Sequence, residues 1–158
     1  MKNKADFFKK LLLIWMGLIC LNSYSQTQAS SKIKSKEWQS LFNNDLVNIN
    51  YRYSECNLIQ DAINKEEYYL QIQNLSNETL TLSWDLELIY GDKCFNCYGE
   101  NDELKFELTL NPNESIEGSC GERNQYKLNI FSKFLDGKSQ AKLSDFNIKN
   151  LTFKNLKL

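Results

Sequence analysis

The stretch "LTLSWDLELIY", Leu80 to Tyr90, decides the fold class. Every second residue in it is large and apolar: Leu80, Leu82, Trp84, Leu86, Leu88 and Tyr90. Successive side chains of a β-strand point to opposite faces, so these six would share one face. A helix would scatter them around its circumference. We therefore predict a half-buried strand with Trp84 in the core.

The same alternation recurs on both sides of this stretch. The only proline, Pro112, falls in a turn between two of the alternating segments, where its missing N–H breaks no ladder. About seven short strands with little helix between them predict an all-β antiparallel β-sandwich. Strands are expected in "VNINYRY" (47–53), "YYLQIQN" (68–74), "LKFELTL" (104–110), "SIEGSC" (115–120), "QYKLNIF" (125–131) and the tail after residue 143.

One short segment resembles a known architecture. "LTLNPNESIEG", Leu108 to Gly118, is similar to the strand–turn–strand of bacterial immunoglobulin-like and fibronectin-III-like modules, which often show an L-x-P-x-x-S-x-x-G pattern there. The resemblance implies an immunoglobulin-like (Ig-like) sandwich. The Cys-to-Trp spacing of true immunoglobulin domains is missing, since Trp84 follows Cys56 by 28 positions. Because sandwiches host many unrelated functions, the resemblance implies no activity.

The N-terminus has the three parts of a secretory signal peptide. Four lysines precede the apolar run Leu11 to Leu21, and small residues at Ser23 and Ser25 suit cleavage after position 25. The run is too short to cross the roughly 30 Å hydrocarbon core. A lipoprotein anchor at Cys20 is disfavoured because Ile19 replaces the small residue expected there. We expect a signal peptide over 1–25, a secreted or periplasmic protein, and no stable membrane span after cleavage.

The mature chain then divides into two parts. Residues 26–45 begin as a polar tether and carry Trp38, Leu41 and Phe42 at i, i+3 and i+4, which predicts a short N-terminal amphipathic helix. Residues 46–158 hold the alternating segments and form the predicted sandwich domain. This length supports one domain with its own hydrophobic core.

Composition excludes several function classes. The chain has no histidine, which removes the usual general base and the commonest metal ligand, so we expect no enzyme. Removal of the leader takes away four lysines and one aspartate and leaves 15 basic and 19 acidic residues, a net charge of −4. A mildly acidic surface argues against nucleic acid as a partner.

Four cysteines remain after cleavage, and in an exported chain disulfides are their usual fate: Cys56, Cys94, Cys97 and Cys120. We favour bonds that use Cys94 and Cys97 separately, one to Cys56 and one to Cys120, because a Cys94–Cys97 bond closes a small ring. The C-x-x-C pair leaves two alternatives open, a redox site and a zinc site. No helix follows the pair, and its acidic surroundings disfavour a thiolate. Zinc usually takes two such pairs.

The loop around these cysteines also holds the candidate binding residues. Carboxylates at Asp92, Glu100, Asp102 and Glu103 form a weak calcium candidate. Exposed aromatic rings can anchor a protein or carbohydrate partner, and the candidates are Phe95, Tyr98 and Tyr69. We therefore predict a secreted, non-catalytic binding or interaction module without a cofactor. A thiol-redox or zinc protein and a structural protein of the cell envelope are the alternatives.

Overall fold

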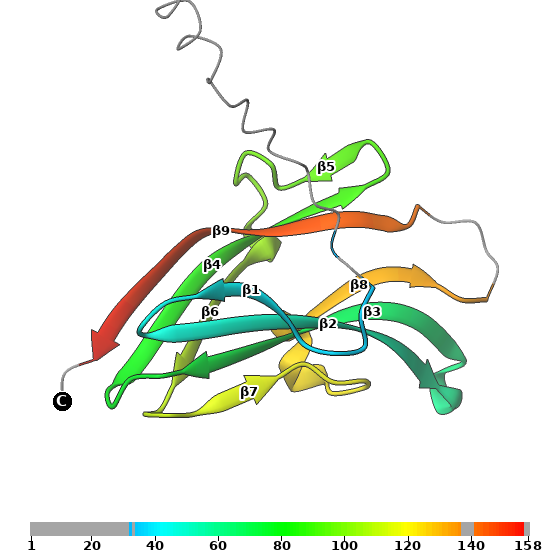
Figure 1. Cartoon of the computed structure of the whole chain (residues 1–158). Coiled ribbons are helices and arrows are strands. Elements are labelled where there is room, and N and C mark those ends of the chain that lie inside the picture. Colours follow the sequence, from blue (N-terminus) through cyan, green and yellow to red (C-terminus); the bar gives the residue numbers. More distant parts are fainter. Residues whose placement is uncertain (1–31, 33, 137–140, 157–158) are drawn as a thin grey trace, which may run out of the picture. The chain divides into compact units, whose positions relative to one another are not determined.

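The computed structural model describes residues 32, 34–136 and 141–156. The predicted signal peptide and the first part of the tether lie outside them. Nine strands are described, together with three short 3₁₀ turns, η2 (Ile59–Asp61), η3 (Asp102–Leu104) and η4 (Arg123–Leu128) (Figure 1). The strands are β1 (Gln39–Asn43), β2 (Val47–Leu58), β3 (Ile63–Asn74), β4 (Thr79–Tyr90), β5 (Lys93–Phe95), β6 (Lys105–Leu110), β7 (Ser115–Glu117), β8 (Asn129–Phe134) and β9 (Leu143–Leu156).

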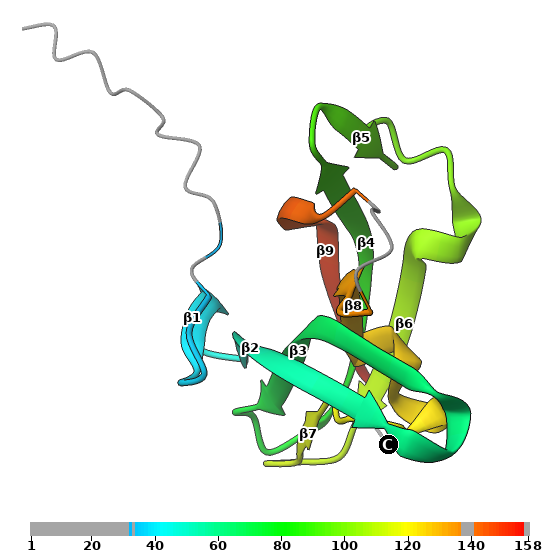
Figure 2. The same cartoon turned by 90° about the vertical axis from the view of Figure 1, so that its right-hand side faces the viewer.

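The strands form two antiparallel sheets, each built around one long central strand (Figure 2). In the first sheet, β3 pairs with β2 along one edge and with β7 and β8 along the other. In the second sheet, β4 pairs with β9 along one edge and with β5 and β6 along the other. Each central strand therefore has one edge shared by two shorter strands, which leaves a gap in the ladder between them.

The core lies between the two sheets, and the predicted stripe of β4 supplies one side of it. Leu80 and Leu82 are fully buried, and Trp84 is 2% exposed. Alternate residues of β2, including Val47 and Ile49, face them from the other sheet. The predicted all-β antiparallel sandwich is thereby confirmed.

The predicted helix at Trp38, Leu41 and Phe42 is wrong, because residues Gln39–Asn43 form strand β1. This strand contains a bulge: Ser40 pairs with Asn50 and Phe42 with Ile49, so Leu41 is an extra residue. Because of the bulge, Leu41 and Phe42 both pack against the core. The apolar residues of this strand are therefore spaced like those of a helix. The sandwich thus starts at β1, before the predicted boundary at residue 46. None of the described segments forms a helix long and apolar enough to cross a bilayer.

Candidate functional site

The site begins at the gap in the edge of the second sheet. β6 pairs with β4 from Leu80 to Asp85, and β5 pairs with it from Leu88 to Tyr90. Leu86 lies between these two segments, so no strand meets its backbone oxygen on that edge. The side chain of Asn96 fills this place, with Nδ2 donating a 3.1 Å hydrogen bond to the Leu86 oxygen. The loop after β5 is therefore fastened to the gap in the ladder.

Asn96 also fixes the shape of the loop that it begins. Its backbone has φ of 63°, a left-handed conformation that asparagine tolerates better than most residues. Its Oδ1 accepts a 3.0 Å hydrogen bond from Asn101 N, and its backbone oxygen accepts one of 3.1 Å from Gly99 N. The loop thus keeps its form through hydrogen bonds that involve neither of the neighbouring cysteines.

Neighbouring residues of β5 point to opposite faces of the strand, so an aromatic ring lies on one face and a cysteine on the other. Phe95 lies opposite Leu88, and Cys94 lies opposite Ile89. Phe95 therefore points to the face that carries the apolar stripe of β4, and Cys94 points to the other face. β5 is the wall between an apolar pocket and a pair of sulfur atoms.

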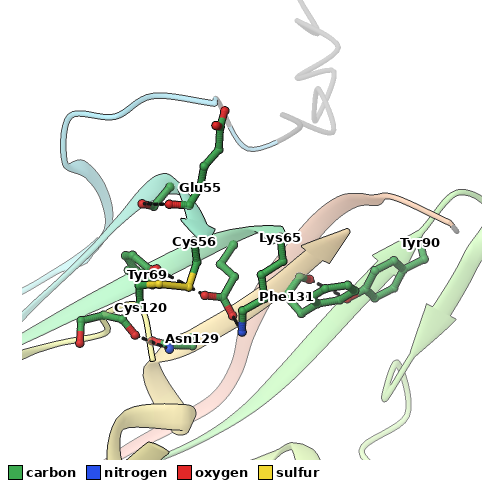
Figure 3. A network of polar contacts seen from close by, with 11 residues as sticks. Glu55, Cys56, Lys65, Tyr69, Tyr90, Cys120, Asn129 and Phe131 are labelled. Carbon is green, nitrogen blue, oxygen red and sulfur yellow. Dashed lines mark hydrogen bonds and ion pairs between the residues drawn. A yellow bond between two sulfur atoms is a disulfide. The ribbon is translucent and has the colours of Figure 1, made fainter. Parts of the chain in front are cut away.

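The pocket on the apolar face has a volume of about 440 Å³. Tyr90 organises it: its ring meets the Phe95 ring edge-on at 5.8 Å, and its hydroxyl donates a 2.6 Å hydrogen bond to the backbone oxygen of Phe131 (Figure 3). Burial raises the pKa of the Tyr90 hydroxyl. The lining is mostly apolar and consists of Leu88, Tyr90, Lys93, Phe95, Asn101, Leu104, Phe131 and Ala141.

The opposite face holds the bond between Cys94 and Cys97, two exposed residues. The carboxylate of Glu87, a residue only 8% exposed, lies with both sulfur atoms in a group whose members are within 4.8 Å of one another. Asn147 Nδ2 donates a 2.9 Å hydrogen bond to Glu87, and Lys149 Nζ lies 3.8 Å from its other oxygen. Over residues 32, 34–136 and 141–156, this is the only group of three cysteine, aspartate or glutamate side chains that could surround a metal ion.

The favoured connectivity is wrong: the structure pairs Cys56 with Cys120 and Cys94 with Cys97. Strand pairing explains the first bond, since the loop after β7 folds over the end of the β2–β3 hairpin, where Cys56 is completely buried. The two bonds differ in how much they stabilise the fold. In the chain-entropy model, joining residues 64 positions apart is worth about 4 kcal/mol, and joining residues three apart about 2 kcal/mol. Cys56–Cys120 is therefore the structural bond.

The structure also buries Tyr69, which the sequence suggested as a binding residue, beside the Cys56–Cys120 bond. Arg52 and Cys56 share the outer face of the first sheet with Tyr69, because β2 and β3 pair in register there. Figure 3 shows the disulfide beside Tyr69, which is only 3% exposed and is no ligand platform. Its hydroxyl donates a 3.3 Å hydrogen bond to Glu67, and burial together with that carboxylate raises the pKa of Tyr69 to about 12.

The other candidates in the loop are exposed, and three of them, Phe95, Tyr98 and Glu100, border one open hollow with the two cysteines. Tyr98 is 90% exposed and Phe95 48% exposed. Asp92, Glu100, Asp102 and Glu103 do not form a metal-binding group among the described residues. Asp102 instead forms a 2.7 Å ion pair with Lys105, whose hydrogen bond lowers the pKa of Asp102.

A second hollow, of about 550 Å³, lies near the Cys56–Cys120 bond. Its buried carboxylate, Glu67, is already neutralised by Lys65 Nζ at 2.6 Å and hydrogen-bonded by Tyr69. The side chain of Asn129, also in its lining, donates to the backbone oxygen of Ser119 and so holds the loop (Figure 3). Glu67 and Asn129 of this hollow thus already serve to stabilise the fold, whereas the pocket beside β5 has the exposed Lys93 at its rim.

No family model matches this chain, and no curated protein or solved structure matches it either. Function therefore has to be inferred from the geometry of the site.

Sequence patterns alone missed several residues of that site. Alternation alone places Tyr90 in the core stripe, Phe131 in an ordinary strand and Glu87 on the face opposite the stripe. The sequence carried no local signal for this site, because Leu88 and Tyr90 lie beyond the part of β4 that pairs with β6, and only the structure shows that pairing.

Proposed function

We propose that this protein is an exported, non-catalytic binding module whose ligand site is the apolar pocket beside β5. The pocket itself carries the proposal. It is preformed, because Tyr90 is fastened to Phe131 and packed against Phe95, and Asn96 holds the loop that carries Phe95. Its 440 Å³ falls within the usual range of roughly 300–1,000 Å³ for small-ligand pockets.

The lining indicates the class of ligand. Leucine and aromatic side chains form the walls, which favours an apolar body. Lys93, an exposed residue, brings a positive charge to the rim, and Asn101 adds an amide. We infer a ligand with an aromatic or aliphatic body and an anionic end, such as a carboxylate, either free or as part of a partner protein.

Two observations support binding rather than chemistry. The Tyr90 hydroxyl already donates its proton to a backbone oxygen, and burial raises its pKa. Among the described residues that line the pocket, the only other ionisable one is the rim lysine. The disulfides indicate an oxidising compartment, and export through the leader over residues 1–25 is part of the proposal.

The test uses aromatic and aliphatic carboxylates paired with neutral alcohols of the same skeleton. Binding is measured by calorimetry and by chemical-shift changes. Phe95→Ala should weaken binding about tenfold, since it removes most of one apolar wall. Lys93→Gln should weaken carboxylates by about twofold to fivefold and leave the alcohols unchanged.

Tyr98→Ala is the matched control, because Tyr98 lies in the same loop but does not line the pocket. It should bind like the parent protein. The proposal fails if no member of the ligand series binds, or if Tyr98→Ala weakens binding as much as Phe95→Ala does.

A further inference from the structure

We propose that the Cys94–Cys97 bond is a thiol–disulfide exchange site that reacts with external dithiols, while Cys56–Cys120 stays closed. The sulfur atoms lie on the opposite face of β5 from the binding pocket, although Phe95 and Asn101 border both the pocket and the hollow beside the sulfur atoms. Three features carry the proposal: access to the sulfur atoms, the small contribution of the bond to stability, and a loop that holds its form without the bond.

Access differs sharply between the two disulfides. Cys94 and Cys97 are both exposed, and they border an open hollow of about 390 Å³ next to Tyr98. In the other bond, Cys56 is completely buried and Cys120 is exposed. A thiolate can therefore attack Cys94–Cys97 at either residue, whereas the second bond is open to attack on the Cys120 side only.

The loop can keep its structure without the Cys94–Cys97 bond. The bond joins residues three positions apart, and Cys94 already belongs to a hairpin with three paired residues on each strand. The hydrogen bonds of Asn96 to Leu86, Asn101 and Gly99 remain when the sulfur–sulfur bond is broken. The two thiols should therefore stay adjacent after reduction, so that closing the bond again is an intramolecular step.

The chemical step balances with a dithiol as the second reactant. One thiolate of the dithiol attacks Sγ of Cys94 or Cys97, the Cys94–Cys97 bond breaks, and the departing cysteine sulfur takes up a proton. The second thiol of the reactant loses its proton and attacks the mixed disulfide, which releases the other cysteine as a thiol. The dithiol loses two electrons and two protons and becomes a disulfide, and the protein pair gains both.

Glu87 opposes the reduced form of this site and so tunes the exchange. Its carboxylate lies within 4.8 Å of both sulfur atoms and repels a thiolate there, while Lys149 offsets part of this charge. The repulsion favours the closed bond and slows attack by the reduced pair. Glu87 is therefore a tuning residue, positioned by Asn147, and not a group that touches the reactant.

The first experiment treats the folded, mature protein with a graded series of dithiothreitol without denaturant. Samples are quenched in acid, alkylated and analysed by peptide mass. Cys94 and Cys97 should be alkylated about tenfold faster than Cys56 and Cys120, with an unchanged circular dichroism spectrum. Reduction of both bonds at the same rate, or of Cys94–Cys97 only on unfolding, would overturn the proposal.

Two sets of variants test the mechanism. With Cys97→Ser, the remaining Cys94 should form a mixed disulfide with oxidised glutathione, which adds the mass of one glutathione; no adduct would count against the site.

Glu87→Gln should raise the rate at which glutathione disulfide closes the reduced pair by about twofold to fourfold at pH 7. The control Glu107→Gln changes a carboxylate that bonds Ser83 and should have no effect. An unchanged or lower rate in Glu87→Gln would remove Glu87 from the mechanism.

Discussion

The Tyr90 hydroxyl donates a 2.6 Å hydrogen bond to the backbone oxygen of Phe131 and so joins β4 of one sheet to β8 of the other. Side chains of both sheets line the open pocket at this end of the sandwich, and this hydrogen bond crosses between the sheets there. The same bond aims the Tyr90 ring at Phe95. One side chain thus links the stability of the fold to the shape of the pocket.

Tyr90→Phe should lower the free energy of unfolding by about 1–2 kcal/mol, because the Phe131 oxygen loses its donor while the ring is kept. Urea denaturation monitored by tryptophan fluorescence provides the measurement. Tyr98→Phe removes a hydroxyl from a residue that is 90% exposed and should change nothing. Equal effects of the two variants would show that the bond to Phe131 does not stabilise the fold.

The two disulfides should differ in their contribution to stability. Replacing both Cys56 and Cys120 with serine should cost about 4 kcal/mol, since the bond joins residues 64 positions apart. The corresponding double variant of Cys94 and Cys97 should cost about 2 kcal/mol or less, because its ring is small and Asn96 holds the loop. Thermal and urea unfolding of both variants measure the difference. The reverse order of stabilities would contradict the assignment of Cys56–Cys120 as the structural bond.

The buried Asn74 is a further structural residue that can be tested. It is completely buried, and its Nδ2 donates hydrogen bonds to the backbone oxygens of Glu78 and Asn111, at 2.8 and 2.9 Å. These bonds join the end of β3 to the start of β4 and to the turn after β6. Asn74→Ala should lower the free energy of unfolding by about 2–3 kcal/mol, because buried backbone oxygens lose their donors. The neighbouring Gln73→Ala should have a small effect, and a large one would point to strand propensity instead of these bonds.

The strand pattern could be predicted from the sequence because apolar and polar residues alternate along a half-buried strand, with one kind on each face. Leu80 to Tyr90 shows this most clearly, and β4 lies where the alternation placed it. Trp38 to Phe42 misled for an equally physical reason. A bulge at Leu41 shifts the alternation by one residue, so a strand acquires the spacing of a helix.

The site could be predicted only in part. The loop with Phe95, Tyr98 and the cysteines stood out by composition, but its partners could not be found from local patterns. Disulfide pairing depends on which loops meet in space, and the loop that carries Cys120 folds over β2 from far along the chain. The contact between Tyr90 and Phe131 likewise joins residues 41 positions apart. Buried carboxylates such as Glu66 were missed because charged residues normally predict a solvated face.

Glu66 should make the stability of the protein depend on pH. It is 5% exposed, and its carboxylate oxygens lie 2.6 Å from Lys34 Nζ and 3.4 Å from Lys133 Nζ. Burial alone would raise the pKa of Glu66, but hydrogen bonds from Lys34 and Tyr53 and the charges of both lysines lower it overall. A carboxyl group whose pKa is lower in the folded state stabilises the fold above its unfolded pKa, and this stabilisation is lost as the pH falls through the folded value.

Glu66→Gln should therefore cost about 1–3 kcal/mol at pH 7, where the lysines lose their charged partner. The difference from the parent protein should stay constant down to the ordinary glutamate pKa of 4.5 and shrink at lower pH, as the parent carboxylate takes up a proton. Urea midpoints measured between pH 7 and pH 2.5 give this difference directly. The exposed Glu103→Gln is the control and should give a small difference at every pH. A Glu66→Gln difference that stayed the same at the lowest pH would mean that packing, and not the charge of Glu66, stabilises this end of β3.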